Sequence, residues 1–249
     1  MQSTLPAPDF QPIRHPTSSA ELPHVTAVMV TGKSAERLPL ARLTAAAFCQ
    51  QTYGSRELLI VNTNVERVEA PGPGIRELHL PDSSYTLGEL RNIGLGEAAG
   101  EWIVQWDDDD WHHPRRIEEQ MKMAERDAAC VLNRQIRLHL EARKGFVYYD
   151  PQGIHGTILH HRRIPWRYPS KGKAEDTEFL HQFARRIVAD NVASLYVRFY
   201  HGHNTWDESH IMRSSGGSVQ SSVLPELYRD LCETLLREFA QAMGLTSLP

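Results

Sequence analysis

Cysteine is scarce in this sequence of 249 residues, and long apolar runs are missing altogether. The three cysteines, Cys49, Cys130 and Cys232, are far apart and form no CxxC pair, so neither a disulfide framework nor a zinc-thiolate site is indicated. No apolar run approaches the ~18 residues of a membrane-spanning helix, and the first two dozen residues lack the hydrophobic centre of a signal peptide. We therefore expect a protein of the reducing cytoplasm, without a transmembrane segment.

An excess of basic residues is missing as well. The chain has 27 Lys and Arg against 31 Asp and Glu, which gives a net charge of −4. This balance argues against a nucleic-acid partner. Hydrophobic residues make up 41% of the chain and charged residues 23%, which is ordinary for a globular protein long enough to bury a substantial core.

The regular part of the sequence is expected to span residues 25–210 as one main domain. A Pro- and Ser-rich lead-in at 1–24 precedes it, and a loop and helix at 211–249 follow it. In the last segment, apolar residues at helical spacing predict an amphipathic helix that packs on the body or on a partner chain. An oligomer formed through this helix is one expectation.

Short β-branched runs alternate with helical patterns after residue 25. Strands are expected at 25–31, 57–62, 75–80 and 101–106, with helices at 41–51 and 86–100. Thr86 and Glu89 have the spacing of a capping box. The alternation predicts an α/β fold with a mostly parallel sheet flanked by helices. Beyond Cys130 the shorter apolar pieces predict a smaller antiparallel region, with a helix at 174–186.

Four consecutive carboxylates, Asp107 to Asp110, follow the fourth expected strand in "QWDDDDW". Adjacent carboxylates repel each other by about 1 kcal/mol at ~4 Å in water, and by more where the dielectric is lower. Ligands of parallel sheets bind at the carboxyl ends of the strands, where this run lies. Mn²⁺ and Mg²⁺ prefer hard oxygen ligands and pair with phosphates, so the run indicates a metal site. The alternative is a solvated acidic loop.

Five blocks of the sequence, taken in order, resemble those of the family 2 glycosyltransferases. They are "VTAVMVT", "CQQTYGSRELLIVN", "LRNIGLGEAAGEWIVQWDDDDWHHPRRIEEQ", "AEDTEFL" and "HGHNTW", and together they span roughly residues 25–206. The resemblance implies a GT-A (Rossmann-like) fold with a nucleotide-binding half at 25–113 and an acceptor half at 114–210. It also implies an inverting, metal-assisted hexosyltransferase of polysaccharide biosynthesis. The implied donor is a UDP- or GDP-sugar, and the implied acceptor is a carbohydrate or glycoconjugate.

The resemblance assigns roles to individual acids. Asp107 and Asp109 are implied to form an Asp-x-Asp motif, in which Asp107 faces the ribose or the metal shell and Asp109 coordinates the metal. Asp108 holds the variable position among the donor-binding residues, or is only solvated. The Glu-Asp block assigns the general base to Asp176, with Glu175 beside it as an orienting or acceptor-contacting residue. For Asp176 the alternative is a helix cap.

Further positions outside the acidic run correspond to functional positions of the family. Thr31 and Arg91 correspond to positions near the nucleobase and the diphosphate, although Arg91 could equally be a surface helix residue. His201 is the first choice for a histidine that approaches the metal, and His203 is the second. Asn62 stands where the family usually has an Asp that contacts the nucleobase. Because an amide both donates and accepts, a preference for uridine does not follow.

Two other functions use the same features. A non-catalytic protein of this fold would bind a nucleotide sugar or a carbohydrate without turnover, because a fold does not determine an activity. A metal-dependent phosphohydrolase or nucleotidyltransferase would use the acidic run for phosphate chemistry. The second of these leaves "AEDTEFL" and "HGHNTW" unexplained.

Overall fold

We describe residues 22–211 of a computed structural model of the chain, except residues 33, 35, 70–71, 82–83, 140–143, 192 and 203. Most of the expected lead-in and all of the expected C-terminal helix beyond residue 211 lie outside this part. Within it, no helix is both long enough and apolar enough to cross a membrane.

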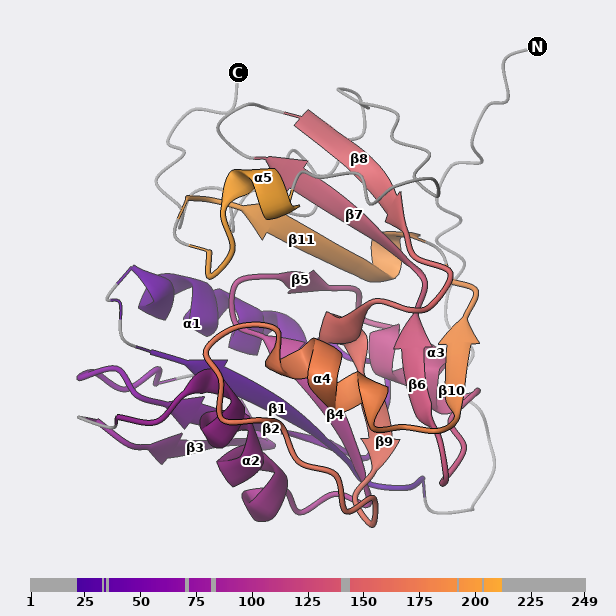
Figure 1. Cartoon of the computed structure of the whole chain (residues 1–249). Coiled ribbons are helices and arrows are strands. Elements are labelled where there is room, and N and C mark those ends of the chain that lie inside the picture. Colours follow the sequence, from indigo (N-terminus) through magenta and orange to yellow (C-terminus); the bar gives the residue numbers. More distant parts are fainter. Residues whose placement is uncertain are drawn as a thin grey trace.

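A seven-stranded sheet forms the lower layer of the molecule, with the strand order β10-β6-β9-β4-β1-β2-β3 (Figure 1). Neighbouring strands are parallel except at β9, which runs antiparallel to both β4 and β6. The expected mostly parallel α/β sheet is confirmed. The strands are β1 (Val25–Thr31), β2 (Arg56–Asn62), β3 (Ile75–His79), β4 (Trp102–Asp107), β6 (Ala129–Leu132), β9 (Leu159–His161) and β10 (Arg186–Ala189).

A second sheet of four strands has the order β5-β11-β7-β8 and lies above the first in Figure 1. It contains β5 (Trp111–His112), β7 (Arg134–His139), β8 (Lys144–Tyr149) and β11 (Tyr196–Tyr200). The pairs β5/β11 and β7/β8 are antiparallel, but β7 and β11 are parallel. The expected antiparallel region is thus antiparallel in two of the three strand pairings of this sheet. A long crossover joins β7 and β11, and such a connection permits parallel pairing.

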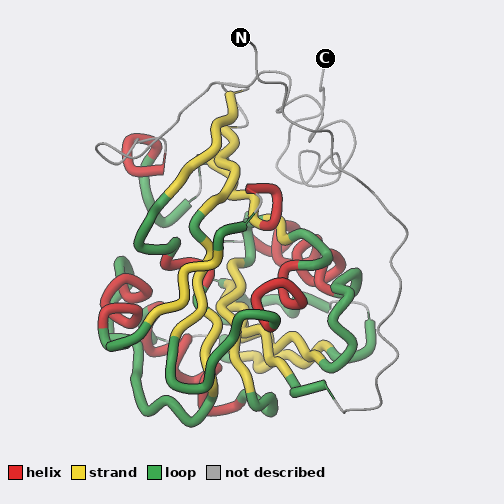
Figure 2. Tube along the Cα trace, turned by 90° about the vertical axis from the view of Figure 1, so that its right-hand side faces the viewer, coloured by secondary structure: helices red, strands yellow, loops and turns green. Residues whose placement is uncertain are grey.

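Helices lie on both sides of the strands, as the side view in Figure 2 shows. The capping box that begins α2 is confirmed: the Thr86 hydroxyl accepts from the Glu89 amide, and the Thr86 amide donates to the Glu89 carboxylate at 2.8 Å. The helix expected to reach residue 186 ends at His181, because Arg186 already belongs to β10. The helices are α1 (Arg37–Phe48), α2 (Leu87–Glu97), α3 (Arg116–Met121), α4 (Glu175–His181) and α5 (Glu208–Ile211), with 3-10 turns η1 (His155–Thr157) and η2 (Ala193–Leu195).

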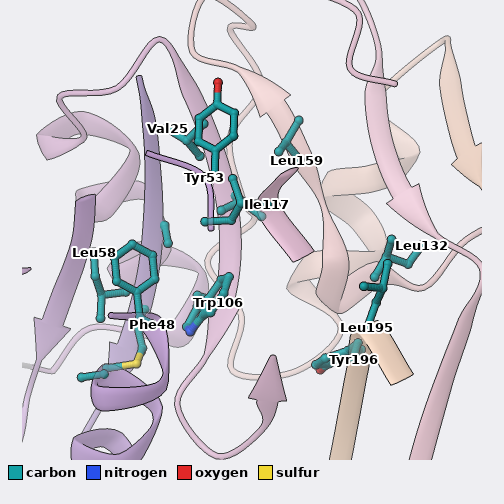
Figure 3. Packing of buried hydrophobic residues seen from close by; sticks show 14 of the residues in the cluster. Val25, Phe48, Tyr53, Leu58, Trp106, Ile117, Leu132, Leu159, Leu195 and Tyr196 are labelled. Atoms are coloured by element: carbon teal, nitrogen blue, oxygen red, sulfur yellow. The ribbon is translucent and has the colours of Figure 1, made fainter. Parts of the chain in front are cut away.

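The core connects the two sheets beneath the end of β4 (Figure 3). Trp106 is fully buried there and meets the Phe48 ring of α1 edge-on, with ring centroids 5.5 Å apart. The same cluster extends to Leu132 of the large sheet and to Tyr196 of the second sheet. Because Trp106 is anchored on several sides, the residue that follows it, Asp107, is held at a defined place between the sheets.

Candidate active site

The acidic run lies at the carboxyl end of the large sheet. Asp107 is the last residue of β4, next to the end of β1, and the three acids after it turn the chain into β5. Helix α1 holds the backbone of this turn, since the Thr44 hydroxyl lies 3.1 Å from the carbonyl oxygen of Asp108 and 3.3 Å from that of Asp110. The turn is thus fixed by a helix on one side and a strand on the other.

The carboxylates of the turn are not solvated. Asp108, Asp109 and Asp110 are only 1%, 8% and 2% exposed. The alternative of a solvated acidic loop is therefore wrong, and so is the alternative that Asp108 is only solvated. Buried like charges destabilise a fold unless opposite charges and hydrogen bonds compensate for their lost hydration. Arginines from separate segments of the chain provide that compensation here.

Arg37, the first residue of α1, binds two of the acids at once. Its guanidinium forms an ion pair with Asp108 through Nη2 and Nε, and its Nη1 lies 2.9 Å from Oδ2 of Asp109. Burial would lower the pKa of Arg37, but the carboxylates of Asp108 and Asp109 raise it above the usual arginine value. Burial also raises the pKa of Asp108, and Arg37 only partly opposes that shift. Arg37 is therefore a permanent cation beside the acidic turn.

Asp109 receives two further contacts from the loop after β11. The ring nitrogen Nε2 of His201 lies 3.1 Å from Oδ2 of Asp109, and Nδ2 of Asn204 lies 3.3 Å from the same oxygen. Burial alone would raise the pKa of Asp109, but Arg37 and His201 outweigh it and hold that pKa well below the usual carboxyl range. Among the described residues no hydrogen bond reaches Oδ1 of Asp109. Asp109 is an anion at any working pH, with one oxygen turned away from these partners.

Asp110 is built into the second sheet. Its Oδ1 accepts from the amide of Phe199 at 3.1 Å, and its Oδ2 accepts from the Tyr196 hydroxyl. Burial raises the pKa of Asp110 well above its usual value, and the neighbouring Asp109 adds to the shift. Asp110 thus serves to join the turn to β11.

Asp107 connects the acidic turn to the Glu-Asp block. Its Oδ1 lies 3.0 Å from Nη2 of Arg91, and Nε of the same guanidinium lies 3.1 Å from Oε1 of Glu175. Arg91 is 7% exposed, so the surface alternative for this residue is wrong. Burial raises the pKa of Glu175, whereas Arg91 opposes the shift. One arginine on α2 therefore holds together two sequence blocks that are far apart in the chain.

Asp176 is the second residue of α4 and is half-buried. The cap position of α4 is held by Ala174, whose φ of 58° is unusual for a residue with a side chain, so Asp176 is not the cap residue. Its Oδ1 accepts from the Thr177 amide at 2.7 Å, and the Thr177 hydroxyl lies 3.1 Å from Nδ1 of His155. No hydrogen bond from a described residue reaches Oδ2 of Asp176. One carboxylate oxygen is fixed and the other is left for a further partner.

Thr31 and Asn62 end the neighbouring strands β1 and β2. Thr31 is buried beside Asp108. The Asn62 amide is occupied by the protein: Nδ2 donates to the Glu66 carbonyl and to Oε1 of Glu77, both at 2.8 Å, and Oδ1 accepts from the Asn64 amide at 2.8 Å. Nδ2 thus binds both the loop after β2 and strand β3. A nucleobase contact of Asn62 stays a prediction, and only its carbonyl oxygen has remaining capacity.

Sequence reasoning missed several residues of this site. Arg37, Tyr196, Arg198 and Asn204 all lie against the acidic turn. Two of them had a local signal: Asn204 belongs to the "HGHNTW" block, and Arg198 is a lone charge within the apolar strand "SLYVRFY". Arg37 and Tyr196 had none. His203 lies outside the described residues.

The side chains of this site suit a divalent cation that takes only a few of its ligands from the protein. Among the residues that the structure describes, no three His, Cys, Asp or Glu side chains are grouped as a metal cage. Nε2 of His201 lies 3.1 Å from Oδ2 of Asp109, and Oδ1 of Asp109 accepts no hydrogen bond from a described residue, so the two residues offer a nitrogen and an oxygen ligand side by side. Ions such as Mg²⁺ often take one or two protein ligands and complete their shell with water and substrate phosphates. The pair therefore suits a cation that arrives with a diphosphate.

Similarity to solved structures confirms the expected GT-A fold. Two structures of residues 1–349 of S. aureus TarS superpose with TM-scores of 0.52 and 0.56, the second in complex with UDP-GlcNAc. They are 14% and 12% identical, and they cover 90% and 91% of this chain and 72% and 68% of theirs. At this identity the likeness concerns the fold alone.

Sequence comparison adds a family match over part of the chain. Residues 36–139 match the model described as Glycosyl transferase family 2, which confirms the resemblance that the motifs carry. Succinoglycan biosynthesis protein ExoO of Rhizobium meliloti (strain 1021) is 27% identical over 122 residues, which are 47% of this chain and 34% of that protein. The chain thus spans about a third of the length of this curated relative.

Proposed function

We propose that this protein is an inverting glycosyltransferase. It would move a sugar from a UDP- or GDP-sugar to a hydroxyl of a carbohydrate or glycoconjugate acceptor. The observation that carries the proposal is the bridge through Arg91, which brings Asp107 and Glu175 to one guanidinium and so unites the acidic turn with the Glu-Asp block. The family match over residues 36–139 and the fold shared with a UDP-GlcNAc complex support the same conclusion.

Asp176 is the proposed general base. Its Oδ2 would accept the proton of the acceptor hydroxyl while the hydroxyl oxygen attacks the anomeric carbon. The bond between that carbon and the diphosphate oxygen breaks on the opposite face, so the configuration inverts and the nucleoside diphosphate leaves with the bonding electrons. The hydrogen bond from the Thr177 amide to Oδ1 keeps the carboxylate in one orientation throughout.

Asp109 and His201, with Asp107 beside them, would hold Mn²⁺ or Mg²⁺ against the donor diphosphate. The cation supplies Lewis-acid stabilisation of the charge that develops on the leaving group. Asp109 is ionised and so suited to bind a cation, because Arg37 and His201 hold its pKa well below the usual range. The remaining residues proposed to lie near the donor, either in direct contact with it or holding a contacting residue in place, are Thr31, Asn62, Arg91 and Asp108.

Thermal unfolding with nucleotides tests the donor part of the proposal. UDP, GDP, CDP, dTDP and ADP are each added with and without Mn²⁺. A nucleotide at ~100 times its dissociation constant stabilises the folded state by about 2.7 kcal/mol, which is readily measured. Stabilisation by one nucleotide in the presence of Mn²⁺ identifies the donor class. A protein that none of them stabilises would contradict the proposal.

Asp176→Asn tests the catalytic part. The variant should bind the nucleotide as the wild type does, yet lose release of nucleoside diphosphate from the matching sugar donor. Glu178→Gln is the matched control, because Glu178 lies on the same helix but is exposed and pairs only with Lys171 among the described residues. A wild-type protein that binds nucleotide and turns over no donor with any sugar acceptor would be a non-catalytic nucleotide-sugar-binding protein.

A further inference from the structure

Strand β11 presents an arginine to the acidic turn. Side chains two apart on a strand lie on the same face, so Arg198 shares a face with Tyr196, whose hydroxyl contacts Asp110 and lies 3.2 Å from Oδ2 of Asp107. Arg198 is thus placed between that hydroxyl and the loop that carries His201. It lies on the side of the site that the second sheet forms.

The guanidinium of Arg198 differs from the other arginines around the turn. Arg37, Arg91 and Arg116 each donate hydrogen bonds to protein oxygens. Arg198 interacts electrostatically with Tyr196 and with three of the acids, but it donates no hydrogen bond and forms no ion pair within the described residues. None of its nitrogens is among the fully enclosed polar atoms that lack a partner. Arg198 is half-buried, so its N–H groups are not fully enclosed by the protein.

A second arginine strengthens the local positive charge. Arg137 is the register partner of Arg198 on the adjacent strand β7, and its guanidinium lies 3.6 Å from the centroid of the Tyr148 ring. Burial and the neighbouring Arg198 both lower the pKa of Arg137, so the two cations are close enough to repel each other. The repulsion between two adjacent guanidinium groups is best relieved by an anion that lies close to both.

We infer that Arg198 binds the diphosphate of the nucleotide donor. The inference rests on the proposed function, and it adds to it a group that no motif assigned. A guanidinium offers a planar fork of N–H donors that matches phosphate oxygens, and such a fork is unfilled here beside the acids that would hold the cation. Arg198 lies on β11 of the second sheet, whereas Arg91 lies on α2, and Arg198 would stabilise the departing diphosphate together with the cation.

Calorimetric titration of Arg198→Gln tests the inference. The ligands are the nucleoside diphosphate that stabilises the wild type, added with MnCl₂, and the corresponding nucleoside, which lacks phosphate. The variant should bind the diphosphate about tenfold to a hundredfold more weakly, the range for loss of a charged hydrogen bond, and the nucleoside as the wild type does. Arg134→Gln is the control, because Arg134 is a half-buried arginine of β7 that pairs with Asp190.

Three outcomes would overturn the inference. They are equal diphosphate affinity in variant and wild type, an equal loss for diphosphate and nucleoside, and an equal loss in the Arg134→Gln control. If Arg198→Gln does not fold, Arg198→Lys replaces it, since it keeps the charge without the fork and should still weaken diphosphate binding. A wild type that binds no nucleotide would refute the proposed function as well. If the wild type binds nucleotide normally, any of the three outcomes refutes only the inference about Arg198 and leaves the proposed function in place.

Discussion

Replacing Arg37 by methionine tests how the acidic turn is stabilised. The methionine keeps an apolar stem at the start of α1 but removes the guanidinium that binds Asp108 and Asp109. Removing one partner from a buried ion pair typically destabilises a protein by 3–5 kcal/mol, because the other charge stays buried. Asp109 keeps its contacts with His201 and Asn204, so we expect the lower end, about 3 kcal/mol. That is a large fraction of a typical stability of 5–15 kcal/mol.

The loss should depend on pH in a defined direction. In the wild type the pKa of Asp109 lies far below its unfolded value, so its stabilising contribution is present above about pH 4 and is lost as the pH falls. In the variant, Asp108 loses the partner that opposes its raised pKa. A carboxyl with a raised pKa destabilises the fold above that pKa, and protonation relieves the cost. The difference between the two proteins should therefore be largest at neutral pH and smaller near pH 5.

Urea unfolding followed by tryptophan fluorescence measures both effects, because Trp106 lies directly before the turn. The titrations are run at pH 7.5 and pH 5.0 without nucleotide and with EDTA. Arg115→Met is the control, since Arg115 forms only exposed ion pairs among the described residues, and such pairs contribute about 0–1 kcal/mol. A loss below 1 kcal/mol at pH 7.5, or a greater loss at pH 5.0 than at pH 7.5, would refute the reasoning.

Three further substitutions have expected outcomes that urea unfolding can check. Arg91→Met should destabilise the fold by about 3 kcal/mol, since it leaves both Glu175 and Asp107 without their shared cation; an effect no larger than that of Arg115→Met would contradict this. Tyr196→Phe removes the hydroxyl that donates to the buried Asp110 and should lower the free energy of unfolding by about 1–3 kcal/mol. The loss should be smaller at low pH, where the Asp110 carboxyl is protonated. The same loss at every pH would be inconsistent with the raised pKa of Asp110. Gly88→Ala should destabilise by about 1–3 kcal/mol despite the better helix propensity of alanine, because its Cβ would lie 1.9 Å from the Pro169 carbonyl oxygen; a more stable variant would refute this.

Several predictions that depended on local signals were accurate, although the helix expected at 174–186 ends at His181. The strand at 25–31 was confirmed to the residue, because a buried parallel strand is a continuous apolar run. The capping box at Thr86 was confirmed because its two partners are three residues apart. The position of the four acids at a strand end was predicted from the apolar segment that precedes them. The GT-A fold followed from the order of the blocks.

The partners of the acidic run could not be predicted in this way. Arg37 lies 71 residues before Asp108, and Tyr196 lies 86 residues after Asp110, so no short window contains either pair. The same limitation explains why solvation was left open as an alternative for Asp108. Charge in a sequence reports the number of ionised groups, whereas their burial and pairing depend on contacts that form only in the folded chain.

The balance of charge around the turn has a kinetic consequence. Four consecutive acids in water would create a field that repels an incoming diphosphate, and such repulsion lowers association rates. Here arginines from α1, α2 and β11 lie among the acids, so the local field is largely cancelled before any ligand arrives. The association rate of a nucleoside diphosphate with this protein should consequently change little with ionic strength, even though the protein carries a net negative charge.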